Sequence, residues 1–383
     1  MRHSWALLFL VCGISLGLLG AELVARFSLP VSASEARVQR ENASSPAPSE
    51  GLRETGLGPS QLAAHPFFGY VGNPALGNVN RFGLFTRHEI KLCAGEARLC
   101  WGDDSLTIGI FGGSLAGQVA SDEEALTALF APAFPGKKIR VVNFAIAGHA
   151  QPQALEIFSY FRDLVQVAIF IDGLNEIWNP VDNNRLGFPP IYAKSLHYRG
   201  LIEQGRGFVA KEKLRIATER SLTPLWRSTA LAHVLWLNAR EAAMDSLREL
   251  EAGAEGRAPF FHAAKGDLVK LGVGEWASAH RQANALGREM GIRLLHFLQP
   301  TLFSGMKKRT AEEEKAAAQY PELKTLVDLG YPLLVAEAKK LGVRDLTTLF
   351  DYEPQEVWID AAHVNARGVM SLREAIAKQL RLR

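Results

Sequence analysis

The sequence predicts an α/β fold, built as a doubly wound parallel sheet with helices on both faces. The first observation is a series of short apolar runs rich in Ile, Val and Phe, which is typical of parallel strands buried on both faces. The second is that amphipathic helical segments alternate with these runs. The expected strands span residues 107–111, 139–145, 165–171 and 292–298.

Three amphipathic segments predict helices that pack on this sheet. They span residues 121–130, 153–164 and 369–380. The first has Asp122 and Glu123 near its start, where the positive end of a helix dipole favours carboxylates. In the last, Val369, Leu372 and Ile376 share one stripe at helical spacing. Each segment therefore has the single apolar face that a helix covering a sheet requires.

The composition indicates a globular protein with a substantial core. The chain has 383 residues, of which 48% are hydrophobic and 22% are charged. Its formal net charge is only +3 and no basic patch is interleaved with aromatic residues, so we expect no nucleic-acid partner. Cys and His do not cluster at the spacing of zinc ligands, and we expect neither a metal nor a cofactor.

The N-terminal segment 1–27 is predicted to be a membrane anchor or a signal segment. Residues 5–21 are uncharged and apolar, which is short for a helix that spans a bilayer and slightly long for the core of a cleaved signal. We favour an uncleaved anchor with the N-terminus inside and the rest of the chain exported. A signal peptide cleaved after Ala33 is the alternative.

Residues 28–64 are predicted to be a flexible linker, and residues 65–383 the globular domain. The linker is rich in Ser, Ala, Pro, Glu and Arg and has little apolar surface to offset the entropy of ordering it. Within the domain, residues 183–279 interrupt the strand–helix alternation and predict a helical insertion, with helices over 211–220 and 222–251. Such an insertion is either a lid over a substrate site or a cap without a catalytic role.

Two of the three cysteines, Cys93 and Cys100, lie close together in a polar stretch. In an oxidising compartment they would close a small disulfide loop, whereas two free thiols are the alternative interpretation. The third, Cys12, lies in the apolar N-terminal segment and follows Val11 rather than a small residue, so a lipoprotein signal is not indicated.

Two short segments far apart in the sequence indicate the chemistry. Ser114 follows Gly112 and Gly113 in a turn directly after an expected strand. His363 stands three residues after Asp360. A serine hydroxyl is a poor nucleophile unless a histidine takes its proton and a third group orients that histidine. The sequence therefore predicts Ser114 as the nucleophile, His363 as the general base and acid, and Asp360 as the orienting carboxylate.

Two further positions predict an oxyanion hole. Gly148 and Asn175 follow the second and third expected strands, as Ser114 follows the first. Active sites of doubly wound sheets lie at the carboxyl ends of the strands, so we expect the three positions to meet there. The backbone amides of Ser114 and Gly148 and the side-chain amide of Asn175 would then surround a developing oxyanion. Gln299, at the end of the last expected strand, is a candidate for shaping the pocket.

These residues also have purely structural interpretations. A serine in a glycine-rich strand–helix turn suits a helix cap or a phosphate cradle, although the P-loop Lys before Ser114 is missing. Taken alone, His363 is typical of a surface or capping histidine, and Asn175 of a turn with Glu176 as its solvated neighbour. His149 is a further candidate for lining the site.

Four segments in order resemble the blocks of the SGNH hydrolase superfamily, also called GDSL-type esterases. They are Gly-Gly-Ser-Leu at 112–115, Asn-Phe-Ala-Ile-Ala-Gly at 143–148, Asp-Gly-Leu-Asn-Glu at 172–176 and Asp-Ala-Ala-His at 360–363. Each block alone is weakly specific, but four in register are specific. The resemblance covers about residues 106–383 and implies a flavodoxin-like sheet. It also implies the nucleophile, the oxyanion donors and the Asp–His pair at the positions named above.

The chain departs from the family pattern at two positions. Gly113 stands where the eponymous Asp precedes the serine, and Glu176 stands where an Asp commonly follows the asparagine. The Gly-Gly-Ser form is similar to the branch that holds membrane-anchored bacterial proteins and polysaccharide O-acetyltransferase-like proteins. That similarity implies that the Ser–His chemistry is retained, and it argues against a simple lipase.

We therefore expect an exported serine hydrolase that cleaves O-acyl esters through an acyl-enzyme on Ser114. Two alternatives stay open: an O-acyltransferase that modifies a cell-envelope polysaccharide, and a non-catalytic protein of this fold that binds glycan or acts as a scaffold. The expected partners are an acyl ester or acylated glycan and, through the N-terminal helix, a membrane. The expected location is the bacterial inner membrane, with the catalytic domain in the periplasm or outside the cell, or secretion if the signal is cleaved.

Overall fold

The computed structural model describes residues 61–76, 79–93, 98–195, 197 and 259–382. The anchor expected at 5–21, most of the expected linker, and the helices expected over 211–220 and 222–251 lie outside these residues. Within the described residues, no helix is both long enough and apolar enough to cross a membrane.

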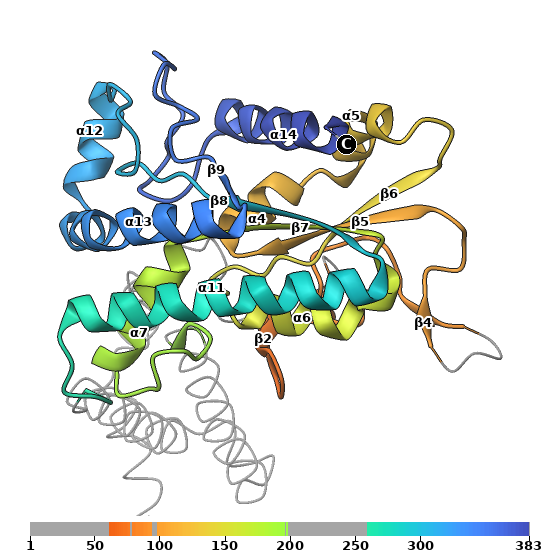
Figure 1. Cartoon of the computed structure of the whole chain (residues 1–383), viewed down its shortest axis with the longest axis horizontal. Helices are drawn as coiled ribbons and strands as arrows, with labels where there is room; N and C mark the ends of the chain where they lie inside the picture. Colours follow the sequence, from red (N-terminus) through yellow and green to blue (C-terminus); the bar gives the residue numbers. More distant parts are fainter. Residues whose placement is uncertain (1–60, 77–78, 94–97, 196, 198–258, 383) are drawn as a thin grey trace, which may run out of the picture. The chain divides into compact units, whose positions relative to one another are not determined.

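Five parallel strands form the central sheet, in the order β6-β5-β7-β8-β9 (Figure 1). Their bounds are β5 (Leu106–Gly112), β6 (Ile139–Asn143), β7 (Val167–Asp172), β8 (Arg293–Leu298) and β9 (Arg344–Asp345). The first of these strands in the sequence lies between the second and the third, which is the strand order of flavodoxin-like folds. The predicted doubly wound parallel sheet is thereby confirmed, and its switch point lies between β5 and β7.

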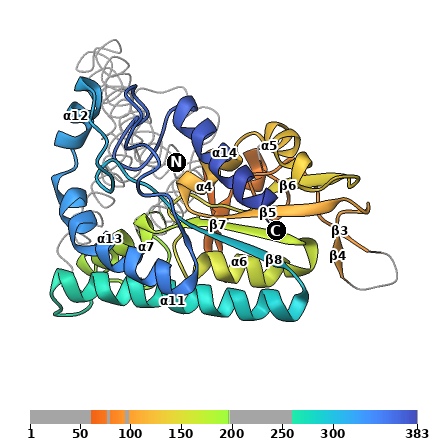
Figure 2. The ribbon, with the colours of Figure 1, turned by 45° about the horizontal axis from the view of Figure 1, so that its top comes forward.

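Side chains alternate between the two faces of the sheet and supply two separate cores. The covering helices are α4 (Ser114–Ala120), α5 (Glu123–Phe130), α6 (Gln153–Phe161), α11 (Lys265–Met290) and α14 (Ala366–Arg381). Ile108 and Ile110 of β5 pack with α4, α5 and α14. Phe111 of β5 and Phe170 of β7 pack on the other face with α6 and α11. Figure 1 and Figure 2 show these two groups of helices on opposite sides of the sheet.

The first helical region differs from the sequence prediction. The helix expected over 121–130 begins at Glu123, and a separate helix, α4, begins at Ser114 itself. Asp122 is the N-cap of α5 and accepts a hydrogen bond from Ala125 N at 3.0 Å. This cap starts α5 two residues later than expected, and α4 is an additional helix that the sequence did not predict.

Two antiparallel hairpins precede the sheet. Their strands are β1 (Leu62–His65) with β2 (Gly69–Gly72), and β3 (Lys91–Leu92) with β4 (Leu99–Cys100). The first strand among the described residues begins at Leu62, three residues before the start of the domain that the sequence indicated. A disulfide joins Cys93 to Cys100 with a Cα–Cα separation of 5.7 Å. The structure confirms the disulfide interpretation of these cysteines, rather than two free thiols.

A third apolar cluster joins three helices at one end of the sheet. They are α7 (Leu174–Arg185), α11 and α13 (Pro321–Leu341), and their shared core includes Ile177, Trp276 and Leu334. At Gly272, α11 approaches α7 so closely that a Cβ would overlap the backbone oxygen of Glu176. The end of the insertion expected over 183–279 thus falls inside α11, because that helix begins at Lys265 and covers the sheet.

We predict that Gly272→Ala destabilises the protein, because the added methyl group has to push α11 away from α7. Overpacking of this kind costs about 1–3 kcal/mol. Gly274→Ala is the matched control, since a Cβ at this position of the same helix would have open space within 4 Å. There the substitution should stabilise the protein by about 0.5–1 kcal/mol. Chemical denaturation measures both effects, and equal stability of Gly272→Ala and the wild type would contradict the close contact.

Candidate active site

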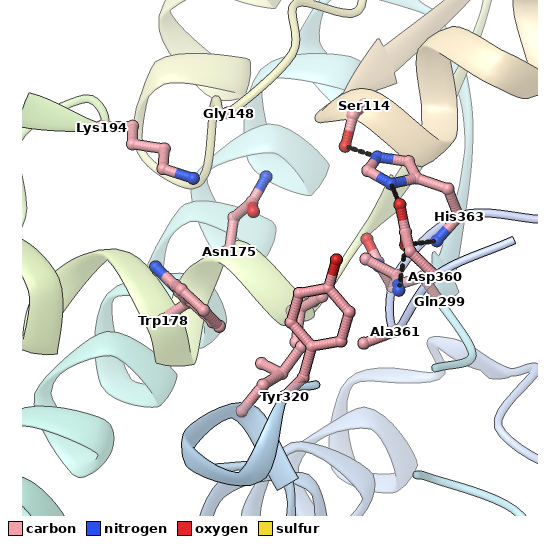
Figure 3. Close-up of a pocket in the computed structure, with 13 residues that line it drawn as sticks. Ser114, Gly148, Asn175, Trp178, Lys194, Gln299, Tyr320, Asp360, Ala361 and His363 are labelled. Carbon is pink, nitrogen blue, oxygen red and sulfur yellow. Dashed lines mark hydrogen bonds and ion pairs between the residues drawn. The ribbon is translucent and has the colours of Figure 1, made fainter. Parts of the chain in front are cut away.

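The carboxyl ends of the strands bring the predicted residues to one pocket. Ser114 begins α4 directly after β5, Gly148 lies in the loop after β6, and Asn175 is in the first turn of α7 after β7. Asp360 and His363 lie on the loop between β9 and α14. All five line the same pocket (Figure 3). The structure thus brings together the five residues that the sequence assigned to the nucleophile, the Asp–His pair and the oxyanion hole.

A short hydrogen bond joins Ser114 to His363. Ser114 Oγ lies 2.7 Å from His363 Nε2, and His363 Nδ1 lies 2.8 Å from Asp360 Oδ2. The ring therefore stands between the hydroxyl and the carboxylate, as Figure 3 shows. With Nδ1 donating to Asp360, Nε2 carries the lone pair that can accept the serine proton.

Asp360 is held by the same short loop that carries His363. Its Oδ1 accepts hydrogen bonds from the backbone N–H groups of Ala362 at 2.7 Å and His363 at 2.8 Å. Burial alone would raise the pKa of Asp360, but the His363 ring and the two backbone donors outweigh burial and lower the pKa from its usual 3.8. The carboxylate is therefore ionised at neutral pH and keeps Oδ2 for the ring.

The turn between β5 and α4 contains two glycines, each for a different reason. Gly112 has a φ of +139°, and a Cβ there would overlap the backbone oxygen of Ile171. Gly113 has a φ of −90°, but a Cβ there would overlap Asn175 Nδ2 and lie 2.9 Å from the backbone oxygen of His149. Gly113, one of the two departures from the family pattern, thus makes room for the asparagine amide beside the serine.

Two hydrogen bonds fix the backbone around Gly148 in the loop after β6. Gly148 has a φ of +79°, and a Cβ there would lie 2.6 Å from Tyr70 Oη, so glycine is required. Its carbonyl oxygen accepts a hydrogen bond from Asn179 Nδ2 at 2.9 Å. Tyr70 Oη donates to the oxygen of Ala147 at 3.0 Å. A trans peptide points its C=O and N–H in opposite directions, so the Gly148 N–H faces away from Tyr70.

Asn175 is anchored through one of its two amide protons. Its Nδ2 donates to the backbone oxygen of His149 at 2.7 Å, which leaves the second proton for a ligand in the pocket. His149 itself is buried, with an exposed fraction of 1%, and its Nε2 lies 3.2 Å from the backbone oxygen of Tyr70. Burial lowers the pKa of His149 to about 3. His149 thus supports the site through its backbone oxygen, whereas the sequence suggested that its ring lines the pocket.

Glu176, the neighbour of Asn175, is buried, so the interpretation of Glu176 as a solvated turn residue is wrong. Its Oε2 accepts a hydrogen bond from Gly173 N at 2.6 Å, and its Oε1 accepts one from Gln151 N at 2.9 Å. Burial first, and then the charge of Asp172, raise the pKa of Glu176 to about 8. Glu176 ties the start of α7 to the loop after β6.

Asp172, at the end of β7, supports this turn from inside the protein. Its Oδ1 accepts a hydrogen bond from Trp276 Nε1 at 2.6 Å and lies 3.2 Å from His280 Nε2. Its Oδ2 accepts a hydrogen bond from Gln151 Nε2 at 2.8 Å. Burial alone would raise the pKa of Asp172, but these partners, His280 foremost, lower it. Trp276 and His280 belong to α11, so this helix holds the strand end from which Asn175 follows.

The pocket has an empty volume of about 560 Å³, part of which is open to solvent. Gln299 lines it, as expected, and the residues that sequence reasoning missed include Trp178, Lys194, Tyr320 and Leu323. Trp178 stands three residues after Asn175, so helical spacing was a usable signal for it. Lys194 Nζ lies 5.6 Å from the centre of the Trp178 ring. Tyr320 and Leu323 come from the start of α13, and no local pattern connects them to the serine.

The arrangement suits nucleophilic attack by a serine on a carbonyl group. The Ser114 hydroxyl is hydrogen-bonded to the His363 ring, and the ionised Asp360 carboxylate orients this ring. Amide donors lie nearby. In the part of the chain that the structure describes, no group of three or more His, Cys, Asp or Glu side chains is arranged to hold a metal ion.

Comparison with known proteins gives distant structural similarity only. No protein-family model and no curated protein matches the chain. The acetylxylan esterase Axe2 of Geobacillus stearothermophilus has 12% identity and a TM-score of 0.34, over 73% of this chain and 95% of its own. The α/β hydrolase LAE5 from a Lake Arreo metagenome has 13% identity and a TM-score of 0.35, over 73% and 98%.

A putative GDSL-like lipase of Parabacteroides merdae has 10% identity and a TM-score of 0.33, over 73% of this chain and 97% of its own. Similarities this distant say nothing about activity, which has to be argued from the geometry of the pocket.

Proposed function

We propose that this protein is a serine hydrolase that cleaves O-acyl esters through an acyl-enzyme on Ser114. The observation that carries the proposal is the continuous hydrogen-bonded relay from Ser114 Oγ through the His363 ring to Asp360, with separations of 2.7 and 2.8 Å. A serine that only caps a helix does not require a histidine and a carboxylate as partners, whereas a nucleophilic serine requires both.

In the first step, Ser114 Oγ attacks the ester carbonyl while His363 Nε2 takes the hydroxyl proton. His363 then returns that proton to the leaving alcohol as the ester C–O bond breaks. Water attacks the acyl-enzyme in the second half, with His363 again as the base. Asp360 stabilises the imidazolium that forms in each half, because its Oδ2 stays hydrogen-bonded to the ring.

The developing oxyanion is stabilised by the N–H groups of Ser114 and Gly148 and by Asn175 Nδ2. Ser114 is the first residue of α4, and the first N–H groups of a helix have no acceptor within the helix. The Gly148 N–H faces away from Tyr70, and Asn175 Nδ2 has a second proton. Loss of one such donor typically costs about 10²–10³ in rate.

The first test is the nucleophile itself. Ser114→Ala should leave less than about a tenth of the wild-type turnover of a short acyl ester, because relay residues act as a unit. The same variant should lose labelling by a serine-reactive fluorophosphonate. Ser371→Ala, a serine of α14 outside the pocket, is the control and should keep both. Full labelling of Ser114→Ala would contradict the assignment, because another serine would then be the reactive one, whereas absence of labelling in the wild type would favour a non-catalytic protein of this fold.

The second test separates the roles of the two residues on the last loop. Asp360→Asn keeps Oδ1 for the two backbone donors, so the loop should survive, but its amide favours the wrong ring tautomer. His363→Ala removes the base. We expect the loss of turnover in Asp360→Asn to be smaller than in His363→Ala by about one to two orders of magnitude. Equal losses in two folded variants would give Asp360 a role beyond orientation, and full activity of Asp360→Asn would remove it from the relay.

Water and a sugar hydroxyl compete for the same acyl-enzyme. Assays therefore include an oligosaccharide acceptor, and the ratio of acylated glycan to free acid separates hydrolysis from transfer to a cell-envelope polysaccharide.

We also propose that the domain acts outside the cytoplasm, tethered by the apolar segment 5–21. The disulfide between Cys93 and Cys100 supports an oxidising compartment. If the segment is an uncleaved anchor, the intact protein should stay with membranes after carbonate washing. Soluble protein that begins near Ser34 would instead show that the segment is a cleaved signal.

A further inference from the structure

Glu313 is an unusual carboxylate, because it is the one buried residue of its helix. It lies in α12 (Ala311–Ala318), and its exposed fraction is 0%. Glutamates are seldom buried unless they are paired. Glu313 has four donors: Val357 N, Trp358 N, Thr310 N and Lys307 Nζ.

Helix capping explains the hydrogen bond of only one of the two carboxylate oxygens of Glu313 to the backbone. Glu313 Oε2 accepts a hydrogen bond from Thr310 N at 3.0 Å, and Thr310 Oγ1 accepts one from Glu313 N at 3.3 Å, which is a reciprocal capping box. Glu313 Oε1 is not needed for this cap. It accepts hydrogen bonds from Val357 N at 2.9 Å and Trp358 N at 3.2 Å, in a distant segment of the chain.

That distant segment is the base of the loop that carries Asp360 and His363. Trp358 pairs with Val364 across the loop as an isolated antiparallel bridge. Ile359 N donates to the oxygen of His363 at 3.0 Å. Val357 and Trp358 are themselves buried, so the base of the loop is packed into the protein and its tip reaches the pocket.

The other side of the loop is held by the helix of the serine. Gln118 Oε1 accepts a hydrogen bond from Val364 N at 3.2 Å, and Gln118 lies one turn after Ser114 on α4. Hydrogen bonds thus hold the loop from α4 on one side and from α12 on the other. A displacement at either of these contacts changes the position of His363 relative to Ser114.

Glu313 and Lys307 form a buried ion pair. Lys307 Nζ lies 2.7 Å from Glu313 Oε2, and the lysine side chain is only 6% exposed. Burial alone would raise the pKa of Glu313, but Lys307 and the backbone donors lower it, so the carboxylate is ionised. Buried ion pairs are weak evidence for stability, because desolvation offsets their attraction.

We propose that Glu313 is a positioning residue that sets the loop of Asp360 and His363 against the serine. Its carboxylate fixes the base of this loop through two backbone N–H groups and so maintains the 2.7 Å contact between His363 Nε2 and Ser114 Oγ. The inference rests on the proposed function, because the position of this loop affects turnover only if Ser114, His363 and Asp360 are catalytic.

Steady-state kinetics of the full-length protein with a short acyl ester test this role. Glu313→Ala removes the acceptor for Val357 and Trp358, and kcat should fall about 10- to 100-fold, because a misplacement of about 1 Å can cost about 10²-fold. KM should change by less than about threefold, since Glu313 is not among the residues that line the pocket.

Two variants serve as controls. Thr310→Ala weakens the same capping box but leaves Glu313 Oε1 on the loop, so its kcat should stay within about twofold of the wild type. Glu313→Gln keeps one oxygen acceptor, and it should retain more of kcat than Glu313→Ala. An equal fall of kcat in Thr310→Ala and Glu313→Ala would overturn the proposal, because capping alone would then explain it.

A second measurement does not depend on turnover. The Nδ1 proton that His363 shares with Asp360 should give a low-field proton NMR signal, identified by its loss in His363→Ala. It should persist in Thr310→Ala and be lost or broadened in Glu313→Ala.

An unchanged signal together with unchanged kcat in Glu313→Ala would overturn the positioning role. Absence of turnover and of fluorophosphonate labelling in the wild type would instead refute the proposed function, and the NMR signal would still decide the role of Glu313. If Glu313→Ala does not fold, Glu313→Asp takes its place in both measurements, because the shorter side chain withdraws the carboxylate from Val357 N and Trp358 N, and the same outcomes then count for and against.

Discussion

The parallel register between β5 and β7 is the constraint on which the site depends. Gly112 pairs with Ile171, so the two strands end almost level at one edge of the sheet. Parallel strands place their carboxyl ends together, and the serine and the asparagine therefore emerge side by side. The register also leaves no space for side chains in the turn after β5. Glycines at 112 and 113 are the consequence: the first avoids the backbone of β7 and the second avoids the amide of Asn175.

Around this edge, buried carboxyl groups connect segments that the sheet alone does not join. Asp172 connects β7 to α11, Glu176 connects α7 to the loop after β6, and Glu313 connects α12 to the last loop. Burying a carboxylate is costly unless donors satisfy it, and each of these has backbone or side-chain donors at hydrogen-bond distance. The pocket is therefore lined by a few reactive groups, and its geometry is maintained by buried carboxyl groups outside it.

Much of the fold and of the site was predictable from local patterns. Apolar runs predicted four of the five strands of the sheet, and β9 was missed because two residues leave no periodic signal. The turn glycines and the Asp–His spacing predicted Ser114, His363 and Asp360, since each motif lies within a few neighbouring residues. Their convergence in one pocket, with the relay distances, is what the structure adds to those expectations.

The sequence by itself indicated the candidate nucleophile, base and carboxylate, and the alternation of four strands with helices. Only the tertiary structure decided that Glu176 is buried, that His149 acts through its backbone, and that Glu313 holds the last loop. The physical reason is distance along the chain. Periodicity and turn chemistry act between near neighbours, whereas Glu313 and Val357 are 44 residues apart. Packing buries both groups away from water, so each needs a hydrogen-bond partner within the protein.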